Sequence, residues 1–308
     1  MFRIFSLMAA AVACTLASVP AAHAQQKFNS PEEAFAALVA TINANDNRGL
    51  IQVLGRDGLD LVVSGDPVAD KSQRQQFLSA YDARHEISRN GDKAYLVVGE
   101  EKFPLPIPLV QKGGSWRFDA VAAREEILFR RIGRNELDTI QTVLAYVAAQ
   151  NDFADNNKSG KFNVYAQRII SDPGKRNGLY WPAAAGEEQS PLGALFAKAS
   201  GEGYHAGRGQ VPYHGYYYKI LTRQGPTAPG GEVDYVVRGQ MIGGFALVAW
   251  PAEYGNSGVK TFLVNHEGVV FEKDLGPRTE RIASRMTEFN PDHTWTKSQA
   301  TATATGAQ

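Results

Sequence analysis

The chain has 308 residues, and its 32 basic and 32 acidic side chains give a net charge of zero. This balance, without a basic stripe or a polybasic patch, excludes the charge pattern of nucleic-acid binders and of membrane-surface proteins. The length favours two folded domains, and the 30 glycines and 12 tyrosines suit a protein rich in turns and sheet.

The first 24 residues have the three parts of a cleavable export signal. Arg3 supplies the positive start, residues 4–19 form an apolar run, and Ala22-His23-Ala24 offers a cleavage site. The run is too short for a retained anchor, and no later stretch approaches the roughly 20 apolar residues of a membrane helix. We therefore expect a periplasmic or secreted protein without an integral membrane segment after cleavage. Cys14, the only cysteine, leaves with this signal, unless a lipoprotein cut before Cys14 retains it.

Residues 25–132 are predicted to form a small α+β domain. Ser30 followed by Pro31 is typical of a helix start, and apolar residues from Phe35 to Ile42 share one face. Further helices are expected at 48–54 and after Asp66. The apolar period then changes to two, which predicts an antiparallel meander with strands at 85–89, 93–98, 103–110 and 116–119.

Residues 133–292 are predicted to form a second α+β domain. The charged segment 124–134 bridges the two domains. A long helix, capped by Asn135 or the residue before it, then runs to about Phe153, with a narrow apolar stripe of Leu137, Ile140, Leu144 and Val147. The Gly/Pro-rich region 159–212 has short helix candidates at 165–170 and 192–199. Strands follow at 213–222, 232–238, 245–251, 259–265 and 269–274, and residues 293–308 are expected to be a disordered tail.

Two fold resemblances follow from these patterns. Helices before a meander in the first domain resemble the cone-shaped fold of nuclear transport factor two and its relatives. The run Arg134-Asn135-Glu136-Leu137, the helix through Gln150 and a meander ending in Gly268-Val269-Val270 resemble the globular part of type IV pilins and pseudopilins. That second resemblance implies one long helix on an antiparallel sheet. Because a whole domain stands where a pilin has its polymerising helix, it implies a pilin-like adaptor rather than a pilus subunit.

A longer resemblance covers the whole chain after the signal. It is similar to a secreted bacterial family known as domain of unknown function 2950, which implies export and a shared architecture but brings no activity and no catalytic residues. The runs that carry this resemblance lie at residues 103–108, 130–137, 178–182, 213–217 and 244–255.

Two patterns invite a metal-site interpretation. Asp155, Asn157 and Ser159, with Gly160, copy the opening of a calcium loop, but Ala166 stands where the closing carboxylate belongs. His205 and His214 lie in the most tyrosine-rich segment. Together with Glu253 they are the candidate ligands of a zinc site, which is the alternative hypothesis. We expect neither a metal nor another cofactor.

The aromatic residues favour a binding interpretation. Trp181, Tyr217, Trp250 and Tyr254 are predicted to offer a ligand-binding face for a glycan or peptide. The expected function is a non-enzymatic binding or assembly module of the cell envelope, with an envelope protein or glycan as partner. The alternative is a hydrolase of envelope polymer whose catalytic residues are His205, His214 and Glu253.

Overall fold

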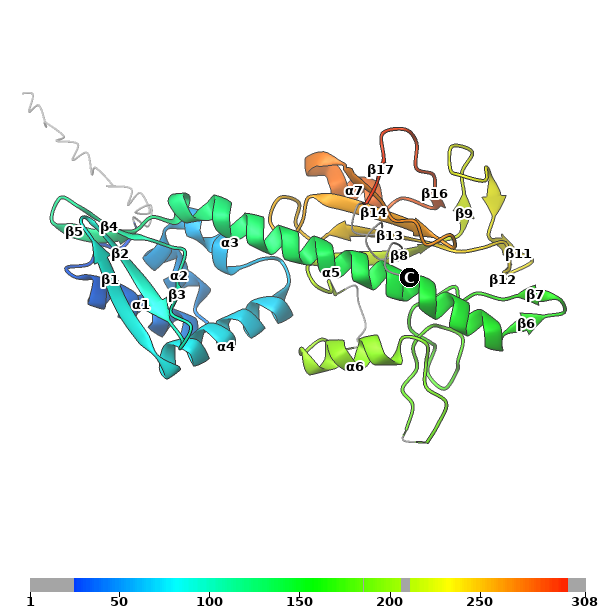
Figure 1. Cartoon of the computed structure of the whole chain (residues 1–308), viewed down its shortest axis with the longest axis horizontal. Helices are drawn as coiled ribbons and strands as arrows, with labels where there is room; N and C mark the ends of the chain where they lie inside the picture. The colour runs from blue at the N-terminus through cyan, green and yellow to red at the C-terminus, as the bar shows by residue number, and fades with distance from the viewer. Residues whose placement is uncertain (1–24, 185, 206–210, 299–308) are drawn as a thin grey trace, which may run out of the picture.

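The computed structural model describes residues 25–184, 186–205 and 211–298. It has helices and antiparallel sheets in two halves, which confirms the α+β class predicted from the sequence. One helix, α5 (Ala120–Asn156), runs along the molecule from the first half into the second (Figure 1). The predicted export signal lies outside the described residues.

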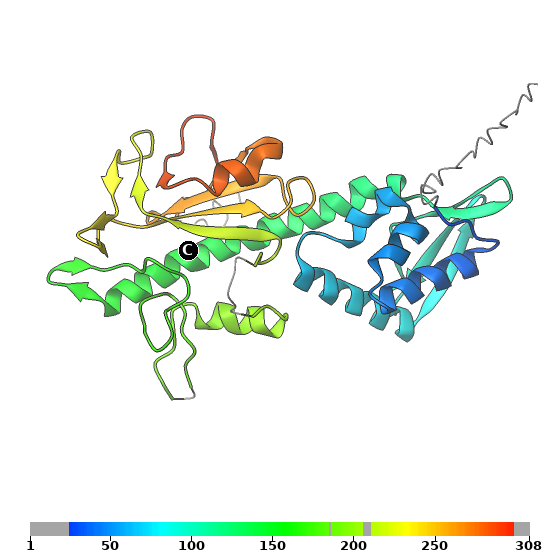
Figure 2. The same cartoon turned by 180° about the vertical axis from the view of Figure 1, so that it is seen from behind.

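Helices pack on a meander in the first half (Figure 2). Ser30 accepts a hydrogen bond from the Glu33 amide and caps α1, as its sequence context predicts. Residues Ala94, Leu96 and Val98 alternate inward from β2 onto these helices. The helices are α1 (Pro31–Asn43), α2 (Asn47–Leu54), α3 (Leu59–Val62) and α4 (Pro67–Ala83), and the strands are β1 (His85–Asn90), β2 (Lys93–Val98), β3 (Phe103–Pro104), β4 (Leu109–Lys112) and β5 (Ser115–Phe118).

The predicted strand 103–110 is split in the structure. Strand β3 pairs with one end of β2, and β4 pairs with the other end and with β5. Pro106 and Pro108 lie between β3 and β4, where their missing amide hydrogens interrupt the ladder. The sheet therefore has the order β1-β2-β4-β5, with β3 at its side.

Helix α5 begins earlier than the sequence analysis predicts. The Asp119 side chain accepts a hydrogen bond from the Ala122 amide and caps the helix there. The charged segment 124–134 is therefore helical rather than a bridge, and the predicted domain boundary after Ile132 falls within a continuous helix. The predicted apolar stripe is also shifted, because Leu137 is 58% exposed whereas Val143 is buried.

The second half is a five-stranded antiparallel sheet of order β17-β15-β14-β13-β8. Every residue of β13 is buried, with α5 on one face of the sheet and α7 on the other (Figures 1 and 2). Its elements are β6 (Lys158–Ser159), β7 (Phe162–Asn163), α6 (Gly193–Gly201), β8 (Tyr216–Leu221), β9 (Arg223–Gln224), β10 (Val233–Asp234), β11 (Val236–Val237), β12 (Gln240–Met241), β13 (Ala246–Pro251), β14 (Lys260–Asn265), β15 (Phe271–Asp274), α7 (Thr279–Ala283), β16 (Glu288–Phe289) and β17 (Thr296–Lys297).

Two predictions for this half need correction. Segment 165–170 forms isolated bridges instead of a helix, as Tyr165 pairs with Met241 and Ile170 with Tyr180. Residues 296–297, assigned to the disordered tail, form β17 and pair with β15. The remainder of that predicted tail, from residue 299, lies outside the described residues.

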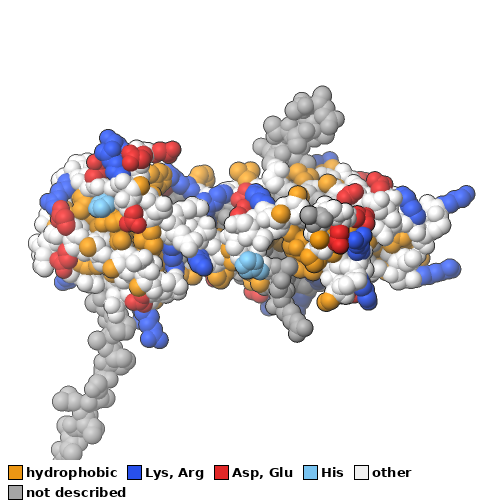
Figure 3. Space-filling view, turned by 90° about the horizontal axis from the view of Figure 1, so that it is seen from below, with side chains coloured by type: hydrophobic (Ala, Val, Ile, Leu, Met, Phe, Trp, Pro, Cys, Tyr) orange, Lys and Arg blue, Asp and Glu red, His pale blue; other side chains and the backbone are white. Residues whose placement is uncertain are grey.

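The described residues form two separate hydrophobic cores. One contains buried residues between Phe28 and Ala123, and the other contains buried residues between Ile140 and Phe289. Hydrophobic side chains also gather in patches on the surface of both halves (Figure 3). In the described ranges, no helix combines the length and apolar character that crossing a membrane requires.

Candidate functional site

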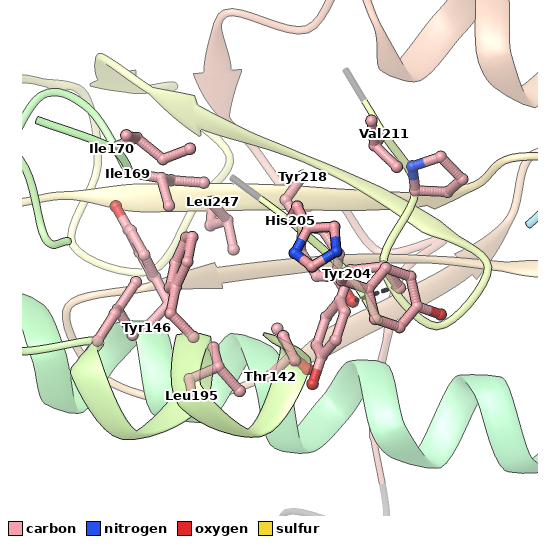
Figure 4. Close-up of a pocket in the computed structure, with 15 residues that line it drawn as sticks. Thr142, Tyr146, Ile169, Ile170, Leu195, Tyr204, His205, Val211, Tyr218 and Leu247 are labelled. Atoms are coloured by element: carbon pink, nitrogen blue, oxygen red, sulfur yellow. Dashed lines mark hydrogen bonds between the residues drawn. The ribbon is translucent and has the colours of Figure 1, made fainter. Parts of the chain in front are cut away.

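An apolar cavity of about 260 Å3 lies in the second half, between α5, α6 and the sheet (Figure 4). Tyr146 reaches it from α5, Leu195 from α6, and Tyr218 and Leu247 from β8 and β13. Its size is near the lower end of small-molecule pockets. The other lining residues are Thr142, Ile169, Ile170, Leu192, Phe196, Ala199, Tyr204, His205, Val211, Pro212 and Tyr213.

Strand alternation decides which tyrosines of β8 reach this cavity. Neighbouring residues of a strand point to opposite faces. Tyr218 points toward α5, where its hydroxyl donates to the carbonyl of Tyr213 at 3.3 Å. Tyr217 points to the other face, and its ring centroid lies 5.8 Å from that of Trp250. The cavity therefore receives one tyrosine from this strand and excludes its neighbour.

The cavity tyrosines are neutral hydrogen-bond donors. Burial raises the pKa of Tyr213 to about 12, and the nearby carboxylates of Glu202 and Asp138 add to this effect. Burial likewise raises the pKa of the Tyr146, Tyr204 and Tyr218 hydroxyls above the usual tyrosine range. None of these phenols supplies a phenolate near neutral pH, so the wall binds by apolar contact and neutral donors rather than by nucleophilic attack.

His214 lies beside this cavity in a cluster of charged groups. Its Nδ1 is 2.9 Å from Asp138 Oδ2 on α5, and its Nε2 is 2.8 Å from Glu202 Oε2 just after α6. The two carboxylates therefore occupy both ring nitrogens of His214. The backbone of His214 has φ +50°, a left-handed conformation that is uncommon for a non-glycine residue and recurs at ligand clamps.

Asp66 joins the two halves next to His214. One carboxylate oxygen accepts from the amides of Val68 and Ala69 and caps α4. The other oxygen accepts from the Tyr204 hydroxyl at 2.7 Å and from the Gly215 amide at 2.9 Å. Because Asp66 is fully buried, these four donors replace the water that a carboxylate otherwise requires. Asp66 thereby fixes the segment that carries both cavity and histidine.

Arg131 forms a second buried connection between the halves. Its guanidinium donates to the carbonyls of Asp60 at 2.7 Å and Leu61 at 2.6 Å, and to the side chain of Asn256. Burial lowers the pKa of Arg131, while the carboxylates of Asp70 and Asp60 oppose this shift. Helix α5 therefore holds α3 against the turn between β13 and β14 through polar contacts.

The structure places the three residues of the alternative hydrolase site in different surroundings. His205 is exposed at the rim of the apolar cavity. His214 has both ring nitrogens occupied by carboxylates. Glu253 accepts from the Asn256 side chain at the junction of the halves. Within the described ranges, no three histidine, aspartate or glutamate side chains are placed to hold a metal ion.

The four aromatic residues predicted to bind a ligand do not form one exposed face. Trp250 is 2% exposed and Trp181 is 8% exposed, and both pack into the second core. Tyr217 packs against Trp250, and the Tyr254 hydroxyl donates to Asp274 in a turn. The structure brings Tyr217 and Trp250 together but leaves Trp181 and Tyr254 in other places.

The calcium-like segment forms a helix end and a tight hairpin. Asp155 belongs to the last turn of α5, and Asn157 caps that helix, with its side chain donating to the Phe153 carbonyl. Ser159 pairs with Phe162 across the turn of the β6–β7 hairpin. The three oxygen-bearing residues thus serve local backbone structure.

The sequence indicates the tyrosine-rich segment but not the acidic residues of the site. Asp66 and Asp138 are distant in the chain from residues 202–214, and only the fold brings them to Tyr204, Glu202 and His214. One local signal was present for Asp66, since it precedes Pro67 at a helix start. Nothing in the sequence linked that helix cap to residues 204–215.

Comparisons with known proteins place the chain in a family. Neither the curated proteins nor the solved structures contain a significant match to it. A family model described as "Protein of unknown function (DUF2950)" matches residues 25–298. Since this match covers most of the chain, the protein belongs to the DUF2950 family.

Proposed function

We propose that this protein is an exported, non-enzymatic binding module of the cell envelope, and that its apolar cavity holds the ligand. The cavity between α5, α6 and β8 carries this proposal. Its aliphatic and aromatic walls match an apolar or amphipathic molecule, and the neutral Tyr213 hydroxyl suits orientation of a polar group.

Two features favour binding over catalysis. The cavity tyrosines remain protonated near neutral pH, so they do not act there as bases. Both ring nitrogens of the adjacent His214 contact carboxylate oxygens, so neither is directed at a substrate. The site therefore offers shape and neutral donors, the properties of a binding pocket.

Export is the second part of the proposal. Arg3, the apolar run 4–19 and Ala22-His23-Ala24 have the order of a secretion signal. The family match begins at Gln25, directly after the expected cleavage site. A reporter fused after Ala24 should reach the envelope, and the same fusion with Arg3 and the apolar run deleted should remain inside the cell.

The finer fold relationships also belong to this proposal. Helix α5 packs on β13 and β14, and Glu136 accepts hydrogen bonds from the amides of Val259 and Lys260 at the start of β14. This helix-on-sheet arrangement supports a pilin-like second half, and the helices on the β1–β5 meander support a cone-like first half. A partner in the envelope, protein or glycan, fits such an adaptor.

A dye titration tests the apolar cavity. The probe is 1-N-phenylnaphthylamine, an uncharged aromatic dye whose fluorescence rises in apolar surroundings. Ala199 lines the cavity from α6, whereas Ala197 on the same helix is exposed. Ala199→Phe fills the cavity and should weaken saturable dye binding by about tenfold or more, equivalent to about 1.4 kcal/mol.

Ala197→Phe is the matched control, since it adds the same ring to the outer side of α6. It should bind the dye as the unmodified protein does. Equal dye affinity in Ala199→Phe and Ala197→Phe would remove the cavity from the proposed function.

A further inference from the structure

A second cavity, separate in chemistry from the apolar one, lies where the two halves meet. It has a volume of about 210 Å3, below the range of pockets for drug-sized ligands. Helix α4 of the first half contributes Ser72, Gln73 and Gln76 to its wall. Helix α5 contributes Arg134 and Asp138, and the segment after α6 contributes Glu202 and His214. Because its walls come from both halves, an occupant contacts both.

Arg134 provides an available positive charge on this wall. Its side chain is exposed and, within the part of the chain that the structure describes, makes no ion pair and no hydrogen bond. Gln73 lines the same cavity and offers an amide. A guanidinium with free donors and an amide on the walls of one cavity suit a carboxylate, which accepts from both.

Negative charge lies one helical turn further along α5. Asp138 follows Arg134 by four residues, so both side chains lie on the same face of the helix, yet they do not form an ion pair. Asp138 and Glu202 each use one oxygen on His214 and are 37% and 33% exposed. The second oxygen of Glu202 lies 3.9 Å from Lys198 Nζ. Both carboxylates line the cavity and can accept from a cationic group there.

The total charge of this wall decides between ligand classes. Arg134 contributes one positive charge, and Asp138 and Glu202 contribute two negative charges. Lys198, whose Nζ lies 3.9 Å from Glu202, supplies a second positive charge beside the wall. These formal charges sum to zero, and the charges of Arg134 and Asp138 are separated by one turn of α5. Such a site disfavours a simple anion and favours a ligand whose own charges are separated over a short length.

We infer that this junction cavity binds a small zwitterion of the amino-acid type, with its carboxylate on Arg134 and Gln73 and its ammonium on Asp138 and Glu202. The inference is independent of the ligand in the apolar cavity. It gives the protein a second binding site, and it explains why an arginine and an aspartate at helical spacing remain apart. Occupation of the site links α4 to α5 and thereby stabilises the contact between the halves.

Calorimetric titration of the full chain tests this inference. The probes are alanine, glutamine and glutamate, each compared with its methyl ester, which lacks the carboxylate, and its N-acetyl form, which lacks the ammonium. At least one free amino acid should bind saturably, and both blocked forms of it should bind at least about tenfold more weakly. Absence of binding by all three up to about 10 mM, or equal binding by a blocked form, overturns the inference.

Variants localise the binding. Arg134→Gln and Glu202→Gln should each weaken binding of the amino acid by about tenfold. Arg134→Gln removes no ion pair or hydrogen bond within the described residues, and Glu202→Gln keeps a side-chain oxygen beside His214. Unchanged thermal unfolding therefore separates lost binding from lost folding. Arg130→Gln, which removes an exposed arginine paired with Glu126 one turn away, is the control and should bind normally. Unaltered amino-acid affinity in both Arg134→Gln and Glu202→Gln would contradict binding at this site. Ala199→Phe, which changes the apolar cavity, should leave the amino-acid affinity unchanged.

Discussion

The interiors of the two halves and the contact between them are built from different chemistry. Each half has its own apolar core, one around Phe35 and Leu96 and the other around Val143 and Trp250. The contact between them depends on buried polar groups, chiefly Asp66 and Arg131. Apolar cores tolerate small shifts, whereas buried hydrogen bonds require defined partners. The relative position of the halves, and with it the junction cavity, is therefore fixed by a few side chains.

Replacing Asp66 should give the largest loss of stability. Asp66→Ala leaves the Tyr204 hydroxyl and the amides of Gly215, Val68 and Ala69 without their acceptor, at a cost of about 3 kcal/mol in the free energy of unfolding. Asp46 caps α2 through one exposed hydrogen bond from Arg48, so Asp46→Ala should cost only about 1 kcal/mol. Urea unfolding measures both. Equal losses would show that Asp66 acts as a helix cap alone.

Replacing Arg131 should separate the unfolding of the two halves. Arg131→Ala removes three hydrogen bonds that connect Asp60 and Leu61 with Asn256, at a cost of about 2 kcal/mol. Because each half retains its own core, calorimetry should show two transitions where the unmodified protein shows one. Arg130→Ala, on the exposed side of α5, should change stability by less than about 0.5 kcal/mol. If Arg131→Ala unfolds in a single transition and loses as little stability as Arg130→Ala, the polar contact does not couple the two halves.

The smallest effect is expected from the pH dependence of Asp70. Burial raises the pKa of this carboxyl above its usual 3.8, although hydrogen bonds from Ser64 oppose the shift. A raised pKa means that the folded state holds the proton more tightly than the unfolded state. The associated stabilisation is complete below pH 3.8 and is lost as the pH rises through the folded pKa.

Asp70→Asn removes this titration and serves as the comparison. The unfolding free energy of the unmodified protein relative to Asp70→Asn should decrease as the pH rises above about 4. Urea titrations across the acidic range measure the difference. An increase over the same range would mean that the Ser64 hydrogen bonds outweigh burial.

The sequence predicts much of the first half because its signals are local. Ser30 and Asp66 each stand before a proline at a helix start, and α1 and α4 begin there. The strand that contains Ala94, Leu96 and Val98 has a strict period of two and is observed with the predicted bounds. Each of these signals lies within a few residues of the element that it determines.

The start of α5 shows where local signals mislead. The charges of segment 124–134 favour a solvated bridge, and the Asp119 cap ahead of them was not recognised. In the structure the same segment crosses from one core to the other, so a helix there has solvent on much of its surface. Arg131 is the exception, since it is buried by partners more than 60 residues away in the sequence.

The site was less predictable than the fold because a shift of one residue along a strand changes which side chain lines the cavity. The tyrosine-rich strand β8 was recognised, but the sequence analysis assigned Tyr217 to the ligand and the structure turns Tyr218 into the cavity. Adjacent strand residues point to opposite faces. Which face carries the cavity depends on α5 and α6, and their positions follow from distant contacts.

A crystal structure of the full chain with 1-N-phenylnaphthylamine tests the binding function of the apolar cavity directly. We expect the dye to lie between α5, α6 and β8, with its rings against Tyr146, Leu195 and Tyr218. Dye bound outside this cavity, with these three side chains packed together and the space between them closed, would contradict a binding function for the apolar cavity.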